Sequence, residues 1–224
     1  MSIIDGKQYL ERIFERLREI YPTFPLKPIA TEYARNGESP FKVLISTVLS
    51  LRTKDPVTLA ATEKLWQKAQ TPATMLKLSA SEISELIYPV GFFRRKAEQI
   101  LAISKILIDE YGGEVPADLE KLKKLPGVGL KTANLVAGVS FGIPAICVDI
   151  HVHRICNRLG FIQTQTPEES ELALKTVIPQ ENWIELNDLL VAFGQNICVP
   201  ISPKCQSSCP IREHCPRIGV GKSR

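Results

Sequence analysis

Residues 125–160 read LPGVGLKTANLVAGVSFGIPAICVDIHVHRICNRLG, and this stretch decides how the rest of the chain is interpreted. It opens with a turn in which Gly127 and Gly129 flank Val128. Glycine adopts positive φ at little cost and has no Cβ to keep a ligand away from the backbone. The first amides of a following helix lack intrahelical partners and attract anions. The turn therefore predicts a phosphate site, although a glycine pair alone favours an ordinary corner between helices.

Two side chains that can do chemistry follow the turn. Lys131 falls in the first turn of the helix that we expect from Leu130 onward. A cation there opposes the helix dipole, which favours the neutral amine, and a neutral lysine amine can form a Schiff base. Asp149 precedes the apolar face of a second helix, where an N-cap belongs, and a carboxylate there can also stabilise positive charge on a sugar. A solvated lysine and a simple cap are the alternatives.

The stretch resembles the helix-hairpin-helix DNA glycosylase superfamily and, within it, the endonuclease III family. The family pattern LPGVGxKTA is present at residues 125–133, and VDTHVxR is present at 148–154 except that Ile150 replaces threonine. The resemblance implies that Lys131 is the catalytic nucleophile and that Asp149 assists it. It also implies that three hairpin amides hold DNA phosphates, those of Gly127, Val128 and Gly129.

Length, composition and charge set the bounds on the protein. The chain has 224 residues, of which 44% are hydrophobic, and a formal net charge of +4, so it forms one large domain or two small ones. A modest positive charge suits a nucleic-acid-binding protein without establishing one. No membrane-spanning run and no secretory leader is evident, so we expect an intracellular protein of the cytoplasm or nucleoid. There, six cysteines favour metal ligands or buried thiols over disulfides.

Apolar residues recur at helical spacing through most of the chain and indicate an all-α fold. The run FKVLISTVLSL after Pro40 is apolar on nearly every face and predicts a buried central helix. Three prolines mark residues 21–38 as a connecting segment, and Leu59 is expected to face inward. We expect helices at 7–20, 40–51, 56–69, 71–78, 81–87, 96–111, 116–124, 130–141, 150–159, 168–177 and 181–194.

Two other stretches match recognition loops of the family, each with a departure. Arg52 stands where the family inserts a glutamine into the gap left by an extruded base. Arginine can stack and hydrogen-bond in such a gap, although a surface arginine is the alternative. In the second stretch, Phe93 replaces a tyrosine, and Phe92 is the candidate wedge between bases. Cations suited to phosphates follow it at Arg94, Arg95 and Lys96.

The C-terminal segment carries four cysteines with the spacing Cys-x6-Cys-x3-Cys-x5-Cys, at Cys198, Cys205, Cys209 and Cys215. A short, proline-rich segment cannot build a core and needs a metal to fold around. Four thiolates allow a structural zinc or a [4Fe–4S] cluster. The resembled family binds a [4Fe–4S] cluster with one residue fewer in the middle gap, which favours the cluster. The cluster would hold a basic loop with Lys204 against the DNA backbone.

The resemblance implies a bifunctional DNA glycosylase and abasic-site lyase of base excision repair, acting as a monomer on damaged duplex DNA, with oxidised pyrimidines as expected substrates. The alternatives are a specificity shifted to abasic sites or to mismatched or deaminated bases, and a non-catalytic helix-hairpin-helix DNA-binding protein. We expect two helical domains flanking a DNA-binding cleft. Residues 29–143 would form a six-helix barrel ending in the helix-hairpin-helix, about 117–141. Residues 1–28 and 144–224 would form the second domain, with the cluster loop at 198–215.

Overall fold

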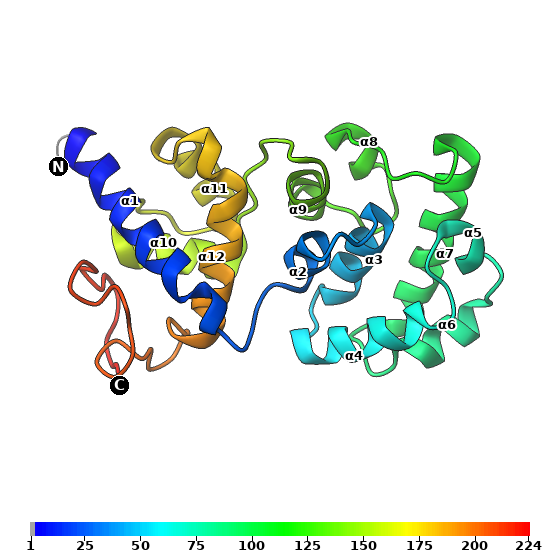
Figure 1. Cartoon of the computed structure of the whole chain (residues 1–224), viewed down its shortest axis with the longest axis horizontal. Coiled ribbons are helices and arrows are strands. Elements are labelled where there is room, and N and C mark those ends of the chain that lie inside the picture. The colour runs from blue at the N-terminus through cyan, green and yellow to red at the C-terminus, as the bar shows by residue number, and fades with distance from the viewer. Residues whose placement is uncertain (1–2) are drawn as a thin grey trace. The chain divides into compact units, whose positions relative to one another are not determined.

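A computed structural model describes the backbone of residues 3–224 and the side chains from residue 6 onward. These residues form twelve α-helices and two short 3-10 helices with no strand, as the sequence predicts (Figure 1). The chain divides into two compact units, Met1–Lys27 with Ile146–Arg224, and Pro28–Ala145. None of the helices of residues 3–224 is both long enough and apolar enough to cross a membrane.

The unit Pro28–Ala145 is built around one buried helix, α3. Val43, Leu44 and Ile45 of this helix are completely buried, and the helix packs against α2, α4, α7 and α9. A helix that is apolar on every face is stable only when neighbours surround it, so the predicted central helix is confirmed. The helices of this unit are α2 (Ile29–Arg35), α3 (Pro40–Ser50), α4 (Asp55–Trp66), α5 (Pro72–Met75), α6 (Ala80–Ile87), α7 (Phe93–Tyr111), α8 (Leu119–Lys123) and α9 (Leu130–Phe141).

Local capping chemistry fixes several helix starts where the sequence predicts them. The Ser39 hydroxyl accepts the Lys42 amide at the start of α3, one residue before Pro40. At α6, the Ser79 hydroxyl accepts the Glu82 amide at 3.2 Å while the Glu82 carboxylate accepts the Ser79 amide at 2.7 Å. This reciprocal pair is a capping box, which satisfies two amides that the helix itself leaves unpaired.

Two expectations about the helices are wrong. Residues 21–38 are not only a connecting segment, because α2 begins directly after Pro28, and its seven residues are too few to show a clear apolar period. Leu59 is 45% exposed, since the apolar residues of α4 are spread around the helix and Leu65 takes the core position. On α11 (Pro167–Val177), Leu174 is fully buried and Leu172 is 70% exposed.

The other unit combines the N-terminal helix with the C-terminal third of the chain. Its helices are α1 (Ile3–Ile20), α10 (Ile150–Leu159), α11 and α12 (Trp183–Asn196), with 3-10 turns at Tyr21–Thr23 and Gln180–Asn182. Ile13, Phe14 and Leu17 of α1 are fully buried in a core shared with α10 and α12. The Tyr21 hydroxyl donates to the buried Asp188 carboxylate at 2.7 Å, which anchors the end of α1 to α12.

A pair of leucines on α4 provides a test of these burial assignments. We expect Leu65→Ala to lower the free energy of unfolding by about 2–5 kcal/mol, because it leaves a cavity in the core. The matched change Leu59→Ala should cost less than about 1 kcal/mol, because the side chain is half exposed. Urea denaturation of both variants measures the difference, and equal losses would contradict the orientation of α4.

Candidate functional site

The glycine-rich turn connects α8 to α9 within the unit Pro28–Ala145. Asp118 caps α8 by accepting the Lys121 amide at 2.9 Å, so this helix begins later than the expected 116–124. Gly127 has φ +78°, a conformation that non-glycine residues rarely adopt. A Cβ at Gly127 would also displace the end of the Gln99 side chain, whose amide nitrogen would lie 2.6 Å away. The turn therefore depends on glycine at this position.

The turn offers fewer amides to a phosphate than the sequence predicts. The Val128 amide donates to the Leu125 carbonyl at 3.1 Å, and the Val128 side chain is buried. Val128 therefore closes the turn, which corrects its prediction as a phosphate contact. Among the hydrogen bonds of residues 3–224, none is donated by the amide of Gly127 or Gly129. These two amides, at the positive end of α9, remain candidates for an anion.

Lys131 lies in the first turn of α9, which begins at Leu130 as predicted. Gly129 is the N-cap residue and has no side chain that could compensate the positive end of the helix dipole. The side chain of Lys131 is exposed to solvent, so its amine is accessible to a large substrate.

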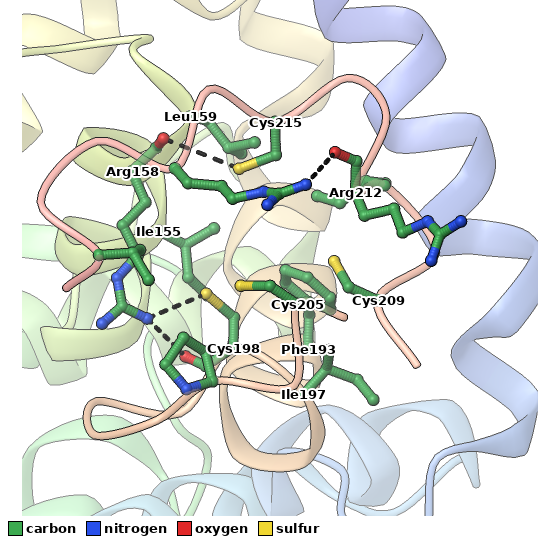
Figure 2. Close-up of a pocket in the computed structure, with 14 residues that line it drawn as sticks. Ile155, Arg158, Leu159, Phe193, Ile197, Cys198, Cys205, Cys209, Arg212 and Cys215 are labelled. Carbon is green, nitrogen blue, oxygen red and sulfur yellow. Dashed lines mark hydrogen bonds between the residues drawn. The ribbon is translucent and has the colours of Figure 1, made fainter. Parts of the chain in front are cut away.

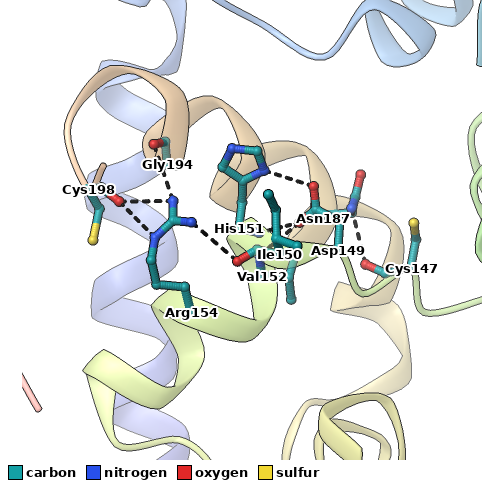
Figure 3. Close-up of polar contacts among 9 residues, drawn as sticks. All are labelled: Cys147, Asp149, Ile150, His151, Val152, Arg154, Asn187, Gly194 and Cys198. Carbon is teal, nitrogen blue, oxygen red and sulfur yellow. Dashed lines mark hydrogen bonds and ion pairs between the residues drawn. The ribbon is translucent and has the colours of Figure 1, made fainter. Parts of the chain in front are cut away.

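Asp149 is the N-cap of α10, as predicted, and is held by more contacts than a cap requires. Its Oδ1 accepts the amides of His151 and Val152 at 2.8 and 2.9 Å. Its Oδ2 lies 2.8 Å from Nδ1 of His151 (Figure 3). The carboxylate side chain is only 11% exposed. Both oxygens are therefore engaged, and the carboxylate is fixed in one orientation.

Arg154 connects α10 to the end of α12 (Figure 3). Its guanidinium donates to the carbonyl of Cys198 at 3.0 Å and to that of Gly194 at 3.4 Å. Burial lowers the pKa of Arg154 from its ordinary value. Near the start of α10, Asn187 of α12 donates to the Cys147 carbonyl at 3.1 Å. The segment leading into α10 and the helix itself are thus both tied to α12.

The four C-terminal cysteines line one pocket together with apolar side chains of α10 and α12 (Figure 2). Cys198 and Cys205 are buried, and Cys209 and Cys215 are partly buried. No carboxylate or imidazole is among the lining residues, so the donor set fits a cofactor bound through thiolates. Across residues 3–224, no group of three or more His, Cys, Asp or Glu side chains is arranged to hold a metal ion.

The surroundings of the pocket show how the cysteine segment is held. The pKa of Cys209 is raised to about 11, chiefly by burial and to a smaller extent by the other three thiols of the pocket, while a backbone hydrogen bond opposes the shift. Arg158, near the end of α10, donates to Sγ of Cys198 at 3.2 Å and to the carbonyls of Val199 and Pro200 at 2.9 and 2.8 Å. Residues 206–208, which hold the extra residue of the middle gap, are exposed, so the longer gap bulges outward while its flanking cysteines keep lining the pocket.

Two neighbouring turns carry the candidate wedge residues in the unit Pro28–Ala145. Arg52 follows the end of α3 with φ +55°, and Phe92 precedes α7 with φ +58°. Both side chains are exposed, and the Arg52 guanidinium carbon lies 5.7 Å from the centroid of the Phe92 ring. The structure thus brings together two residues that lie far apart in the sequence, and it leaves the Phe92 ring on the surface.

The predicted cluster of phosphate-binding cations is divided by the structure. Arg94 and Arg95 are exposed on the first turn of α7, and Lys204 is partly exposed in the cysteine segment. Lys96 is only 4% exposed, and its amine donates to the Leu49 carbonyl at 2.8 Å. Burial lowers the pKa of Lys96 to about 8. Lys96 is therefore an internal residue, and the prediction that it contacts phosphate is wrong.

Sequence reasoning missed two residues of these sites. The sequence predicts no role for His151, although a histidine two residues after an N-cap aspartate can turn its ring back to the cap carboxylate. The sequence also predicts no role for Arg158, although a cation in the last turn of a helix can donate to the backbone of a loop that is distant in the sequence. Its position at the end of an amphipathic helix was the available signal.

Comparisons with known proteins agree with this arrangement. Residues 45–180 match the HhH-GPD model, described as the HhH-GPD superfamily base excision DNA repair protein. Endonuclease III of Thermotoga maritima is 47% identical over 95% of this chain and 97% of its own length. A trapped endonuclease III–DNA covalent intermediate superposes with a TM-score of 0.80 at 35% identity, covering 96% of each chain. A thermostable thymine-DNA glycosylase superposes with a TM-score of 0.76 at 26% identity, covering 93% of this chain and 96% of its own.

The family model covers more than half of the chain, and the Thermotoga maritima relative spans nearly all of it. This chain therefore belongs to the HhH-GPD superfamily of base excision DNA repair proteins and, within it, to the endonuclease III family.

Proposed function

We propose that this chain is a bifunctional DNA glycosylase and abasic-site lyase that removes damaged bases from duplex DNA. The observation that carries the proposal is the exposed amine of Lys131 at the start of α9, directly after the hairpin. An enzyme that only removed the base with an activated water would not need a nucleophilic amine at this place. Family membership and the similarity to a trapped covalent endonuclease III–DNA intermediate support the proposal. The enzyme acts as a monomer, in the compartment that holds the DNA.

The first steps of the proposed mechanism are binding and extrusion of a nucleotide. The amides of Gly127 and Gly129 bind phosphate oxygens, which position the duplex without reading its sequence. The damaged nucleotide must leave the stack, because its sugar cannot be reached inside the duplex. Arg52 and Phe92 occupy the gap that it leaves, so that the flipped state is not lost to restacking.

The chemical steps use one amine and one carboxylate. The neutral Lys131 amine attacks C1′ as the N-glycosidic bond breaks, and the base leaves with a proton. The Asp149 carboxylate stabilises the positive charge that develops on the sugar. The C1′–O4′ bond then breaks, so that the sugar ring opens, O4′ takes up a proton and a Schiff base forms between Lys131 and C1′. The Schiff base acidifies C2′, a proton is lost there, and the 3′ phosphate leaves by β-elimination. Water then hydrolyses the Schiff base and regenerates the lysine.

The substrate class that we propose is oxidised pyrimidines. A second candidate is a mismatched thymine or a deaminated base, which the similarity to a thymine-DNA glycosylase and the departure at Arg52 both favour. The two differ in which base the enzyme extrudes and share the lysine chemistry.

Borohydride trapping tests the nucleophile. We expect wild-type protein to form a covalent adduct with duplexes carrying thymine glycol or an abasic site, and Lys131→Ala to form none. Lys121→Ala removes another exposed lysine of the helix-hairpin-helix and should trap as wild type does.

Each other outcome has a defined meaning. An adduct on the abasic site alone would support Lys131 as the nucleophile but show that the enzyme removes a base other than thymine glycol. A duplex with a G·T mismatch would then be tested next. No adduct with any duplex, while binding persists, would refute the lysine mechanism and leave either a glycosylase that only removes the base or a non-catalytic DNA-binding protein. An adduct that survives in Lys131→Ala would identify a different amine.

The change Asp149→Asn separates capping from chemistry. Asparagine is as good an N-cap as aspartate, so the stability of α10 should change little. Removing the negative charge should slow base removal by about a hundredfold or more, because the transition state loses its electrostatic partner. Single-turnover kinetics on a lesion duplex, with urea denaturation as the stability control, measure the two effects. A variant as active as wild type would reduce Asp149 to a cap.

We further propose that Cys198, Cys205, Cys209 and Cys215 bind a [4Fe–4S] cluster. The proposal is supported by the gathering of four thiols around one pocket and by the outward bulge of residues 206–208. When bound, the cluster supplies cross-links that order a segment with no core of its own. The residues that it orders include Lys204, which would then face the DNA backbone.

Metal analysis tests the cluster. We expect anaerobically purified protein to contain about four irons per chain, and Cys209→Ser to lose iron and unfold at lower temperature. Cys147→Ala, at a buried cysteine outside the pocket, should keep its iron. About one zinc per chain in place of iron would favour the structural zinc site, and the absence of both metals would refute the proposal.

A further inference from the structure

Lys96, the buried lysine of α7, donates hydrogen bonds to three groups at the end of α3 and in the turn that follows it. The Lys96 ammonium donates to the carbonyls of Leu49 and Leu51 at 2.8 and 2.6 Å, and to the Thr53 hydroxyl at 3.3 Å. An ammonium group has three hydrogens, so these three acceptors use all of its donors. Leu49 and Leu51 belong to the end of α3, where carbonyls lack intrahelical partners and a cation is favoured by the helix dipole.

The same contacts connect the two turns that carry the candidate wedge residues. Thr53, which accepts from Lys96, also accepts the Gly91 amide at 3.1 Å. A Cβ at Gly91 would lie 2.7 Å from the Arg52 carbonyl, so the two backbones touch. Arg52 lies between the acceptors of Lys96 on one turn, and Phe92 follows Gly91 on the other.

The wedge residues have an unfavourable backbone conformation that something must hold. Arg52 and Phe92 both have positive φ, which residues with a side chain seldom adopt without support from their surroundings. Such residues gather at ligand-binding sites because a strained turn aims a side chain where a relaxed one would not. Capping of α3 does not require the hydrogen bond from Lys96 to Thr53. The Thr53 hydroxyl also accepts the Gly91 amide, so this bond links Lys96 to the turn that carries Phe92.

We propose that Lys96 is a positioning residue that locks the two turns together, so that Arg52 and Phe92 enter the duplex as one stacked unit. This inference rests on the proposed function, in which these side chains fill the gap of the flipped nucleotide. Lys96 itself does not touch DNA, because it is buried behind the turns. Its removal releases the Arg52 turn from the Phe92 turn and leaves the chemistry of Lys131 in place.

The experiment compares damage recognition with chemistry. Lys96→Met keeps an unbranched side chain of similar length and removes the donors. We expect it to reduce the preference for a duplex with a tetrahydrofuran abasic-site analogue over undamaged duplex by about tenfold. Borohydride trapping on single-stranded abasic DNA, which has no gap to fill, should proceed as in wild type. Lys105→Met, at an exposed lysine of the same helix, is the matched control and should change neither.

A double-mutant cycle distinguishes positioning from general stability. In the background Arg52→Ala with Phe92→Ala, the change Lys96→Met should have no further effect on the preference for damaged duplex, because the residues it positions are gone. Full additivity, or an unchanged preference in Lys96→Met alone, would overturn the inference. If Lys96→Met does not fold, Thr53→Val removes the connecting hydroxyl at a partly exposed site and should show the same loss and the same non-additivity.

The controls keep the inference separate from the function on which it rests. Wild-type protein that neither prefers the damaged duplex nor traps would refute the proposed function. A wild-type preference that survives Arg52→Ala with Phe92→Ala would show that these side chains are not the wedge. A wedge that works equally well without Lys96 would refute the positioning role alone.

Discussion

The unpaired backbone groups at helix ends are the constraint on which this structure depends. A chain of short helices has many ends, and each end leaves amides or carbonyls that the helix cannot satisfy. In this protein, several of the side chains that pair with these amides and carbonyls belong to the candidate functional sites. Asp149 covers the amides of α10, Lys96 covers carbonyls of α3, and the amides before α9 remain for an anion. Stability and function therefore draw on the same few positions.

The charge of a side chain at a helix end shows whether it stabilises that helix. By this criterion, Lys131 differs from the other charged residues of the candidate sites. An acid at a helix start and a cation at a helix end complement the dipole, and Asp149 and Arg158 place both on α10. Lys96 at the end of α3 follows the same rule. Lys131 breaks it, because a cation at the start of α9 opposes the dipole. A position that violates a local rule of helix stability is where function is expected.

The sequence predicts features whose signal is local and misses those that depend on packing. The starts of α9 and α10 and the all-apolar α3 follow from neighbouring residues alone. The burial of Lys96 was not predictable, because nothing near it in the sequence shows that α3 ends beside it. The prediction that the Val128 amide binds phosphate is wrong for a similar reason. That amide closes a turn whose geometry the amino-acid sequence does not specify.

The two departures from the family pattern affect different properties of the wedge. Phe93 packs edge-on against Tyr88, with ring centroids 5.3 Å apart, so losing a hydroxyl there changes little that faces outward. Arg52 is exposed, and its side chain differs from glutamine in kind, since glutamine donates and accepts whereas arginine only donates. Besides stacking, a donor-only group can hydrogen-bond to an orphan base only through that base's acceptors. Under the proposed function, the choice of opposite base, and through it the choice of lesion, would therefore depend on Arg52 more than on Phe93.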